Sequence, residues 1–273
     1  MAKFVSDTAS AHLRILLVGA SLFIGACSSD NAADNSEYVE EPVTKLYNYA
    51  LNALEQEQYD EASTRFDEVE RQHPYSTWAI KAQVMAAYSL YMANKYDDAV
   101  VALDRFIQLH PSNKDADYAY YLKGLCYYEQ ISDVGRDQLM TELALKTLNE
   151  LTTRFPDSQY TRDAQLKIEL THDHLAGKEM DVGRYYQDKA QYLAAINRFD
   201  TVVKKYQTTT HVPEALLRLV ECYLALGLKE EAKKNAAVLG HNFPGSSWYY
   251  DAYALLKDPS IKAPEGDPWY KVW

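Results

Sequence analysis

The stretch "YDDAVVALDRFIQLHP", residues 96–111, decides the fold because its pattern returns along the chain. Apolar residues recur in it every three or four positions, which predicts an amphipathic helix with one face to bury. Pro111 disfavours helical geometry in the residue before it, so we expect the helix to end there. Residues 59–74, "YDEASTRFDEVERQHP", show the same arrangement 37 residues earlier. A pattern that returns at a fixed spacing is typical of repeat proteins.

Five segments of the chain share this pattern. Each has an alanine at the same place, and the twelfth residue after it is a proline in four of the five. The alanines are Ala62, Ala99, Ala144, Ala195 and Ala232, and the closing residues are Pro74, Pro111, Pro156, Gln207 and Pro244. A second amphipathic pattern precedes each segment and carries a small or modest residue at a corresponding place: Ala50, Ala87, Gly124, Gly183 and Val220.

The repeating unit is therefore predicted to be two antiparallel helices. They can pack closely where small residues let the backbones approach and large apolar residues, such as Phe66 and Leu103, fill the remaining space. One pair cannot bury its apolar face alone, whereas stacked pairs can. The pattern resembles tetratricopeptide repeats, whose usual unit is about 34 residues. We expect an all-α fold: a right-handed superhelix (α-solenoid) of five tetratricopeptide-like helix-turn-helix repeats with a concave inner wall.

The sequence also predicts how the chain is divided. We expect a lipoprotein signal peptide over residues 1–26, a flexible tether over 27–42, five repeats over 43–258 and an irregular aromatic tail over 259–273. The expected repeats are 43–79, 80–116, 117–159, 160–212 and 213–258.

Two departures from the 37-residue spacing predict irregularities. The segment "QISDVGRDQL", residues 130–139, is expected to be an inserted loop between the two helices of repeat three. Residues 157–180 are helical in pattern and are expected to lengthen the first helix of repeat four, with a break at Gly177. Inserted loops usually serve contacts.

The beginning of the chain has the layout of an export signal. The apolar run Ile15–Ala26 is shorter than the roughly 20 residues that a membrane-spanning helix needs, and it follows a weakly basic start. Residues 24–27, "IGAC", resemble the bacterial lipobox, which implies that Cys27 carries a lipid and becomes the new N-terminus. By resemblance to the sorting rules of Gram-negative lipoproteins, Ser28 favours the outer membrane. The alternative is a chance cysteine after an ordinary cleavage site.

Several strings resemble the BamD family, the lipoprotein of the outer-membrane β-barrel assembly (BAM) machinery. They are "LDRFIQLHPSNKDADYAYYLKGLCYYEQI" (103–131), "RFPDSQYTRDA" (154–164), "LAGKEMDVGRYY" (175–186) and "AAINRF" (194–199). The resemblance runs from about Leu46 to Leu256 and implies a lipid-anchored periplasmic scaffold at the outer membrane, without catalytic activity. It further implies docking on the last POTRA domain of the barrel-forming subunit, association with other BAM lipoproteins, and recognition of unfolded outer-membrane protein precursors. The alternative is a periplasmic lipoprotein adaptor that organises other envelope-biogenesis enzymes.

Tyrosine is common in this chain, at 23 of 273 residues, and many tyrosines fall on the expected inner wall. Such a wall offers apolar area with hydrogen-bonding tips, which suits an extended peptide that ends in an aromatic residue. The alternative is that these tyrosines only pack between helices. The peptide-groove candidates of repeats one to three are Tyr47, Leu51, Val84, Tyr88, Tyr91, Tyr118, Tyr121 and Tyr128.

The corresponding positions in repeats four and five are more polar. They are Met180, Arg184 and Gln187 in repeat four, and Glu214, Leu217 and Glu221 in repeat five. We therefore expect two working surfaces, one for the substrate in the N-terminal half and one for a machinery partner in the C-terminal half. In the BamD family an Asn-Arg pair faces the barrel-forming subunit, and Asn197 and Arg198 match it. The alternative is that Arg198 is a solvated residue that pairs with Asp200 or nearby acids.

Other chemistry is weakly indicated. The net charge of −11 argues against nucleic-acid binding. Cys126 and Cys222 fall in repeats that are not neighbours, so we expect buried thiols rather than a disulfide. His172 and His174 are two residues apart, which places them on different helix faces and makes a poor metal pair. No phosphate loop, zinc motif or nucleophile motif is present. We therefore expect no catalytic residue, no metal and no cofactor other than the covalent lipid on Cys27.

The segment "KAPEGDPWYKVW", residues 262–273, contains two prolines and one glycine and is not expected to be helical. It nevertheless carries Trp269, Tyr270 and Trp273, and exposed tryptophans usually find a surface. This tail could fold back on the last repeat or dock on a partner; the alternative is a frayed end.

Overall fold

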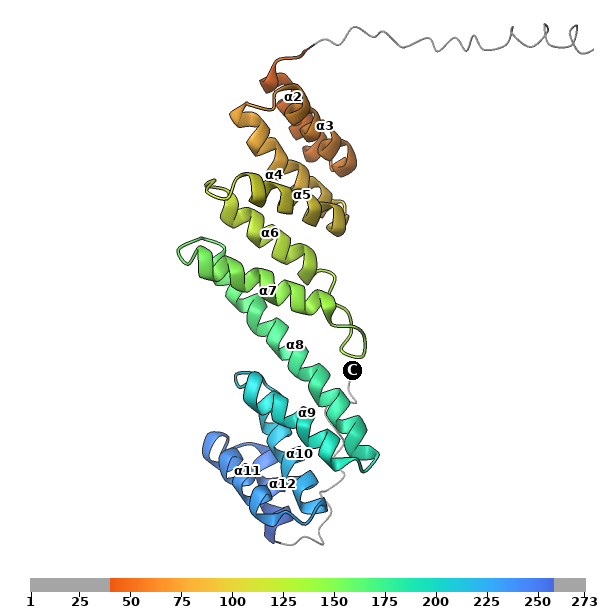
Figure 1. The fold of residues 1–273 in the computed structure, drawn as a ribbon, viewed down its shortest axis with the longest axis vertical. Coiled ribbons are helices and arrows are strands. Elements are labelled where there is room, and N and C mark those ends of the chain that lie inside the picture. Colours follow the sequence, from red (N-terminus) through yellow and green to blue (C-terminus); the bar gives the residue numbers. More distant parts are fainter. Residues whose placement is uncertain (1–39, 258–273) are drawn as a thin grey trace, which may run out of the picture. The chain divides into compact units, whose positions relative to one another are not determined.

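The structure is a computed structural model that describes residues 40–257. Eleven helices and no strands occur in this part of the chain, and each helix packs against the next one in sequence (Figure 1). The expected all-α stack of tetratricopeptide-like helix pairs is thereby confirmed. The five pairs are α2 (Val43–Glu55) and α3 (Tyr59–Gln72), α4 (Thr77–Met92) and α5 (Tyr96–Leu109), α6 (Ala116–Tyr128) and α7 (Leu139–Arg154), α8 (Thr161–Asp188) and α9 (Tyr192–Lys205), and α10 (Val212–Ala225) and α11 (Lys229–Asn242).

The second helix of each pair ends where the repeat predicts. Helices α3, α5, α7 and α11 each stop two residues before a proline, and α9 stops two residues before Gln207. The residue just after each of these helices has left the helical region, as His110 does with φ −131° and ψ 53°. Because α9 ends in the same way without a proline, the position in the repeat fixes the end and proline reinforces it.

The turn inside four of the pairs has one geometry. Glu57, Asn94, Ala190 and Gly227 all have φ between 58° and 77°. At Ala190 the backbone N–H bonds to Gln187, and the next N–H, of Gln191, bonds back to Tyr186. This is the Schellman arrangement that satisfies the last carbonyls of a helix.

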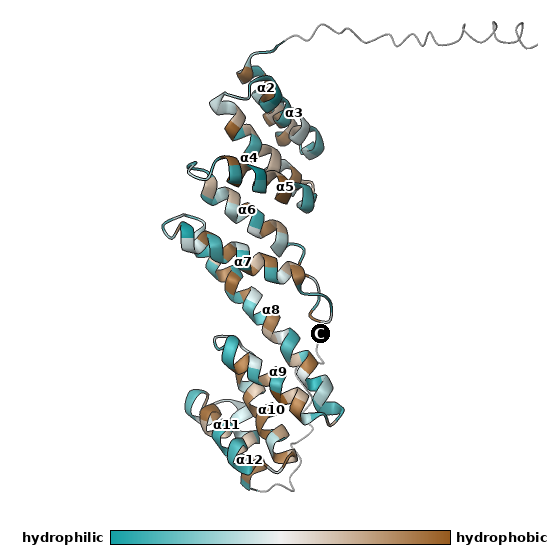
Figure 2. Ribbon diagram, viewed as in Figure 1, coloured by the Kyte–Doolittle hydropathy of each residue, from teal (hydrophilic) through white to brown (hydrophobic). Residues whose placement is uncertain are grey.

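The core is a series of local clusters rather than one mass. Buried residues of α2, α3 and α4 form the first cluster, those of α4, α5 and α6 the second, and those of α6, α7 and α8 the third. The fourth cluster runs from the second half of α8 to the last helix. Brown apolar residues accordingly recur among teal polar ones along each helix (Figure 2). The long helix α8 contributes to both of the last two clusters.

Small residues on the first helix let large residues on the second lie against the backbone. A Cβ atom at Gly124 would stand 2.5 Å from Leu148 Cδ2, and one at Gly183 would stand 2.4 Å from Phe199 Cε1. Leu148 and Phe199 are completely buried. This is the close helix approach expected from the repeat pattern.

The two irregularities of the repeat lie together in space. The inserted loop separates α6 from α7, and α8 is 28 residues long. The break expected at Gly177 is absent, because the helix runs through this residue without interruption. Gly177 instead lies under other parts of the chain: a Cβ there would be 3.3 Å from His211 Nε2 and 3.5 Å from Val134 Cγ1 of the inserted loop.

One helix had no expected counterpart. Helix α12 (Ser247–Lys257) follows the fifth pair and packs on both α10 and α11. The signal peptide, Cys27, most of the tether and the aromatic tail lie outside the described residues, so those expectations stay predictions.

Candidate protein-binding surfaces

Half-buried tyrosines connect the first helices of the second, third and fourth pairs. Tyr88 and Tyr91 lie on α4, and Tyr118, Tyr121 and Tyr128 on α6, and all five are partly accessible to solvent. Tyr160, just before α8, extends the row, because its ring stacks on Tyr121 at 4.9 Å and 17° and lies 5.3 Å from Tyr118. We call these six residues the tyrosine surface.

Acidic side chains accept hydrogen bonds from two phenol hydroxyl groups of this surface. The hydroxyl of Tyr121 donates to Asp163 Oδ2 of α8 at 2.6 Å, and that of Tyr91 donates to Glu129 Oε1 at 3.5 Å. Burial, with the neighbouring Glu129 carboxylate, raises the pKa of Tyr91 to about 12. Burial and the hydrogen bond to Asp163 likewise raise the pKa of Tyr121. The phenols therefore stay neutral near pH 7 and keep their hydrogen-bonding capacity.

A cation lies over the far end of the same surface. Lys167 Nζ of α8 stands 4.7 Å from the ring centre of Tyr128. A lysine over an aromatic face interacts favourably with the ring quadrupole. The tyrosine surface thus combines apolar ring faces, two carboxylates and one ammonium group within a row that spans three helices.

Tyr47 does not fit the expectation for a groove residue. It is 9% exposed, and its ring packs edge-on against Phe66 at 5.3 Å and Trp78 at 4.8 Å. The alternative interpretation, packing between helices, describes this residue. Val84 is also buried, in the second cluster. Neither side chain offers surface to a partner, so neither belongs to the tyrosine surface.

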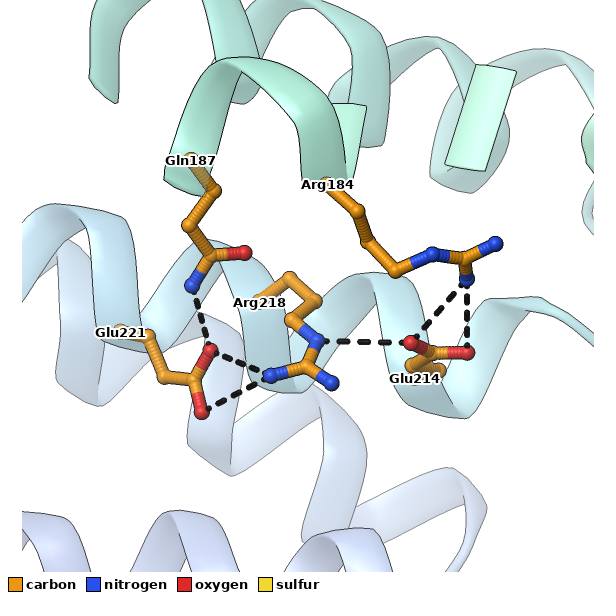
Figure 3. A network of polar contacts seen from close by, with 5 residues as sticks. All are labelled: Arg184, Gln187, Glu214, Arg218 and Glu221. Carbon is orange, nitrogen blue, oxygen red and sulfur yellow. Dashed lines mark hydrogen bonds and ion pairs between the residues drawn. The ribbon is translucent and has the colours of Figure 1, made fainter. Parts of the chain in front are cut away.

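The polar positions of repeats four and five face one another. Arg184 Nη1 on α8 contacts both carboxylate oxygens of Glu214 on α10, at 3.3 and 3.4 Å. Gln187 Nε2 donates to Glu221 Oε2 at 2.6 Å. Arg218 joins the two acids, with Nε 3.3 Å from Glu214 and Nη1 3.0 Å from Glu221 (Figure 3). We call these five residues the polar network.

The polar network is balanced and largely buried. Its two arginines and two glutamates cancel in charge, and the side chain of Glu214 is only 4% exposed. Burial acts to lower the pKa of Arg218, but Glu221 and Glu214 outweigh it and the net shift is upward. Because these side chains are paired with each other, their polarity does not by itself mark a partner surface.

The Asn-Arg pair lies on an accessible part of α9. Asn197 and Arg198 are both exposed. Arg198 Nη1 contacts Glu179 Oε2 of α8 at 3.2 Å, whereas Asp200 pairs with Lys204. The alternative in which Arg198 pairs with a nearby acid therefore describes part of its environment, although its partner is Glu179 and its side chain stays 45% exposed.

The remaining candidates show structural roles. Cys126 and Cys222 are free and buried, and burial raises the pKa of each thiol to about 12. His172 lies 5.8 Å from the ring of Tyr206. Between residues 40 and 257, no three His, Cys, Asp or Glu side chains gather closely enough to hold a metal ion.

Comparison with known proteins identifies the family. A family model described as "Outer membrane lipoprotein", YfiO, matches residues 39–239. The chain is 47% identical over 262 residues to the "Outer membrane protein assembly factor BamD" of Caulobacter vibrioides, a match that covers 96% of this chain and 85% of that protein. The chain belongs to the YfiO/BamD family. The proteins of the same name from Rickettsia prowazekii and Neisseria meningitidis serogroup A are 47% and 31% identical, over 89% and 95% of this chain and 95% and 98% of their own lengths.

The family resemblance seen in the sequence is thereby confirmed. The family model is that of an outer-membrane lipoprotein. Among the helices of residues 40–257, none has both the length and the apolar character required to cross a bilayer.

Two members of these surfaces, Tyr160 and Arg218, were not predicted from the sequence. Tyr160 precedes α8 and does not occupy the repeat position of Tyr118, because the equivalent prolines Pro111 and Pro156 are 45 residues apart and place that position at residue 163. Arg218 lies on the expected inner face of α10, four residues after Glu214, and only the approach of α8 reveals that it links two acids. Both residues therefore become visible as members of these surfaces only in the folded chain, Tyr160 through its ring contacts with Tyr118 and Tyr121.

Proposed function

We propose that this chain is a non-catalytic assembly factor for outer-membrane β-barrel proteins, anchored by a lipid on Cys27 at the periplasmic face of the outer membrane. Its relatives carry the printed name of outer-membrane protein assembly factor. In this proposal the tyrosine surface binds unfolded precursors, and the tether of residues 27–42 lets the helical body reach them from the membrane. The observation that carries the proposal is the row of half-buried tyrosines across α4, α6 and the start of α8.

The chemistry of the tyrosine surface supports a peptide partner. Tyrosine rings supply rigid apolar area, and aromatic pairs are worth about 0.5–1.5 kcal/mol beyond the area that they bury. An unfolded precursor segment with aromatic side chains could stack on these rings. Asp163 and Glu129 at the tips would favour cationic or N–H donor groups of the segment over acidic ones.

Asn197 and Arg198 are proposed to contact the barrel-forming subunit through its POTRA domain, with other BAM lipoproteins in the same assembly. Their exposure leaves them available to a partner, and Glu179 holds Arg198 in place. The polar network joins α8 to α10 and so sets the position of this part of the chain.

Peptide affinity tests the proposed surface. The probe is a synthetic peptide from the end of an outer-membrane β-barrel protein that finishes in an aromatic residue. Replacing Tyr88, Tyr91 and Tyr121 together by alanine should weaken its binding by about tenfold or more, because hot-spot aromatics each cost at least about 1–2 kcal/mol when truncated. The matched control is Tyr75→Ala, since Tyr75 is fully exposed in a loop outside this surface. Unchanged affinity in a folded triple variant rejects the surface.

Charge reversal tests the partner contact. Arg198→Glu should reduce co-purification of the barrel-forming subunit, because it places like charges beside Glu179 and removes the cation offered to the partner. Lys204→Glu is the control on the same helix, since Lys204 is an exposed surface lysine paired within the helix to Asp200. Equal recovery with both variants counts against the contact.

A further inference from the structure

The last helix of the stack has an aromatic outer side. Ala252 is the only fully buried residue of α12, whereas Tyr250 and Tyr253 are 62% and 47% exposed. The ring of Tyr249 lies 5.8 Å from that of Tyr250 and 6.3 Å from that of Tyr253. A stack of helix pairs normally finishes with a polar outer face, because no further pair covers it. The exposed rings of α12 therefore indicate that a further segment packs on this side of the helix.

A shallow pocket lies between α11 and α12, next to these rings. It has a volume of about 330 Å³ and is lined by Ala236, Ala237 and Gly240 on α11 and by Tyr249, Tyr253 and Leu256 on α12. The two helices touch where a Cβ at Gly240 would meet Tyr249 at 2.5 Å. The lining is small on one side and aromatic or aliphatic on the other, which suits a flat aromatic side chain.

Two lysines border the pocket. Lys233 belongs to its lining, and Lys257 Nζ lies 4.4 Å from the ring centre of Tyr253. Lys233 is already paired with Glu230 at 2.8 Å, so the site selects its occupant mainly by aromatic character.

We propose that residues 259–273 of this same chain cover the outer side of α12 and place Trp269 or Trp273 in the pocket. The segment starts two residues after Lys257, and therefore within two turns of Tyr253 and Leu256. It carries two tryptophans and one tyrosine, and so matches the apolar lining of the pocket. Its two acids, Glu265 and Asp267, are balanced by Lys262 and Lys271, so the match rests on the aromatic residues. The contact would cover the exposed aromatic side of α12, the last described helix of the stack.

The geometry of the chain allows this contact. The eleven residues of α12 span about 16 Å. Sixteen residues from 258 to 273 can extend to roughly 50 Å, which is enough to reverse direction and run back along the helix. Pro259 disfavours helical geometry at Asp258, directly after Lys257, so a change of direction at this point is expected. The inference does not depend on the tyrosine surface, which lies on other helices.

Photo-crosslinking in the full mature chain tests the proposal. With p-benzoylphenylalanine in place of Tyr253, irradiation should join this position to a residue between 259 and 273 of the same molecule, identified by mass spectrometry of the monomer band. The same probe at Tyr75, a fully exposed residue of a loop between α3 and α4, should not capture that segment. Capture of a second copy, capture of lipid or detergent alone, or no capture of residues 259–273 overturns the proposal. So does capture of that segment by a probe at Tyr91 in place of one at Tyr253.

A thermal double-mutant cycle provides a second measurement. Replacing Trp269 and Trp273 by alanine should lower the Tm by about 4 °C or more. Ala237→Glu, at an exposed position, puts a carboxylate in the pocket and should lower the Tm similarly, and the combined variant should show no further loss. The control is Val238→Glu, an exposed neighbour outside the pocket lining, which should leave the effect of the tryptophan changes intact. Additive losses for Ala237→Glu and the tryptophan changes contradict the proposal.

Discussion

Single side chains decide how closely the helices of each pair approach. The glycines at 124 and 183 stand where a side chain would enter the space of a buried Leu148 or Phe199. In a helix, alanine is normally preferred to glycine by about 1 kcal/mol. These positions therefore keep glycine against local helix propensity, because packing against the second helix outweighs it.

Replacing Gly183 by alanine tests this balance. The new Cβ would meet the ring of Phe199 at 2.4 Å, and overpacking of a filled core costs about 1–3 kcal/mol. We expect a net loss in the free energy of unfolding, measured by urea denaturation. Gly245→Ala is the control, because no atom lies within 4 Å of a Cβ built there. A Gly183→Ala protein as stable as the parent would show that Phe199 can move aside freely.

The two buried thiols make the free energy of unfolding decrease as the pH rises into the alkaline range. Burial raises the pKa of Cys126 and Cys222 from 9.0 to about 12, so the folded chain holds these protons more tightly than the unfolded chain. Their contribution is complete below about pH 9 and is lost as the pH rises towards 12. The decline is at most about 1.4 kcal/mol per pH unit for each thiol.

Replacing both cysteines by alanine should therefore flatten the pH dependence of the unfolding free energy between pH 9 and pH 12. Parent and variant are compared by the slope of the unfolding free energy against pH. The loss of packing in the variant lowers this free energy at every pH and so does not change the slope. Tyr91, with its pKa also raised to about 12, and other tyrosines with raised pKa values, such as Tyr118 and Tyr121, leave a residual slope in the variant. Identical slopes in parent and variant would contradict the assignment to the thiols.

At the scale of helices, the 37-residue repeat fixes how each element begins, turns and ends. The same left-handed backbone conformation recurs at Glu57 and Asn94, which are 37 residues apart, and at Ala190 and Gly227, which are also 37 residues apart. Local signals of this kind are readable from sequence because proline, small residues and spacing act on their neighbours. The length of α8 was also predictable from the spacing, but the absence of a break at Gly177 was not, because His211 and Val134 cover that glycine from other parts of the chain.

The polar network joins α8 to α10, and the sequence alone did not indicate which of its side chains pair with each other. Arg218→Met removes the cation that lies between Glu214 and Glu221, so that Glu214 keeps Arg184 and Glu221 keeps Gln187 from this network. We expect a loss of about 1–3 kcal/mol in the free energy of unfolding, because hydrogen bonds to charged groups are lost while each acid keeps another partner. Urea denaturation provides the measurement.

The double variant Arg218→Met, Glu221→Leu should recover part of that loss, because it removes a carboxylate together with its cation. Gln187 then loses its acceptor, so the recovery is incomplete. A single variant with unchanged stability would mean that the network carries no net interaction between the two helices.

At the scale of the described chain, stacking in sequence order brings distant tyrosines into one row. Each cluster of the core shares helices with the next, so the positions of α4, α6 and α8 depend on packing along the stack. The helix pairs, the family and most of the tyrosine surface could be predicted from sequence, because repeats place equivalent positions on equivalent faces. The burial of Tyr47 could not, since it depends on Trp78 of the next pair filling the space beside it.

In the proposed function the tyrosine surface serves the assembly of outer-membrane β-barrel proteins. The most direct test replaces the cell's own copy by the variant with Tyr88, Tyr91 and Tyr121 changed to alanine, expressed at the parent level, and measures folded porins in the outer membrane. A general fall in folded barrels, with the Tyr75→Ala control unaffected, is the predicted result. Normal porin levels together with a defect in another envelope process would contradict the account and favour the adaptor alternative.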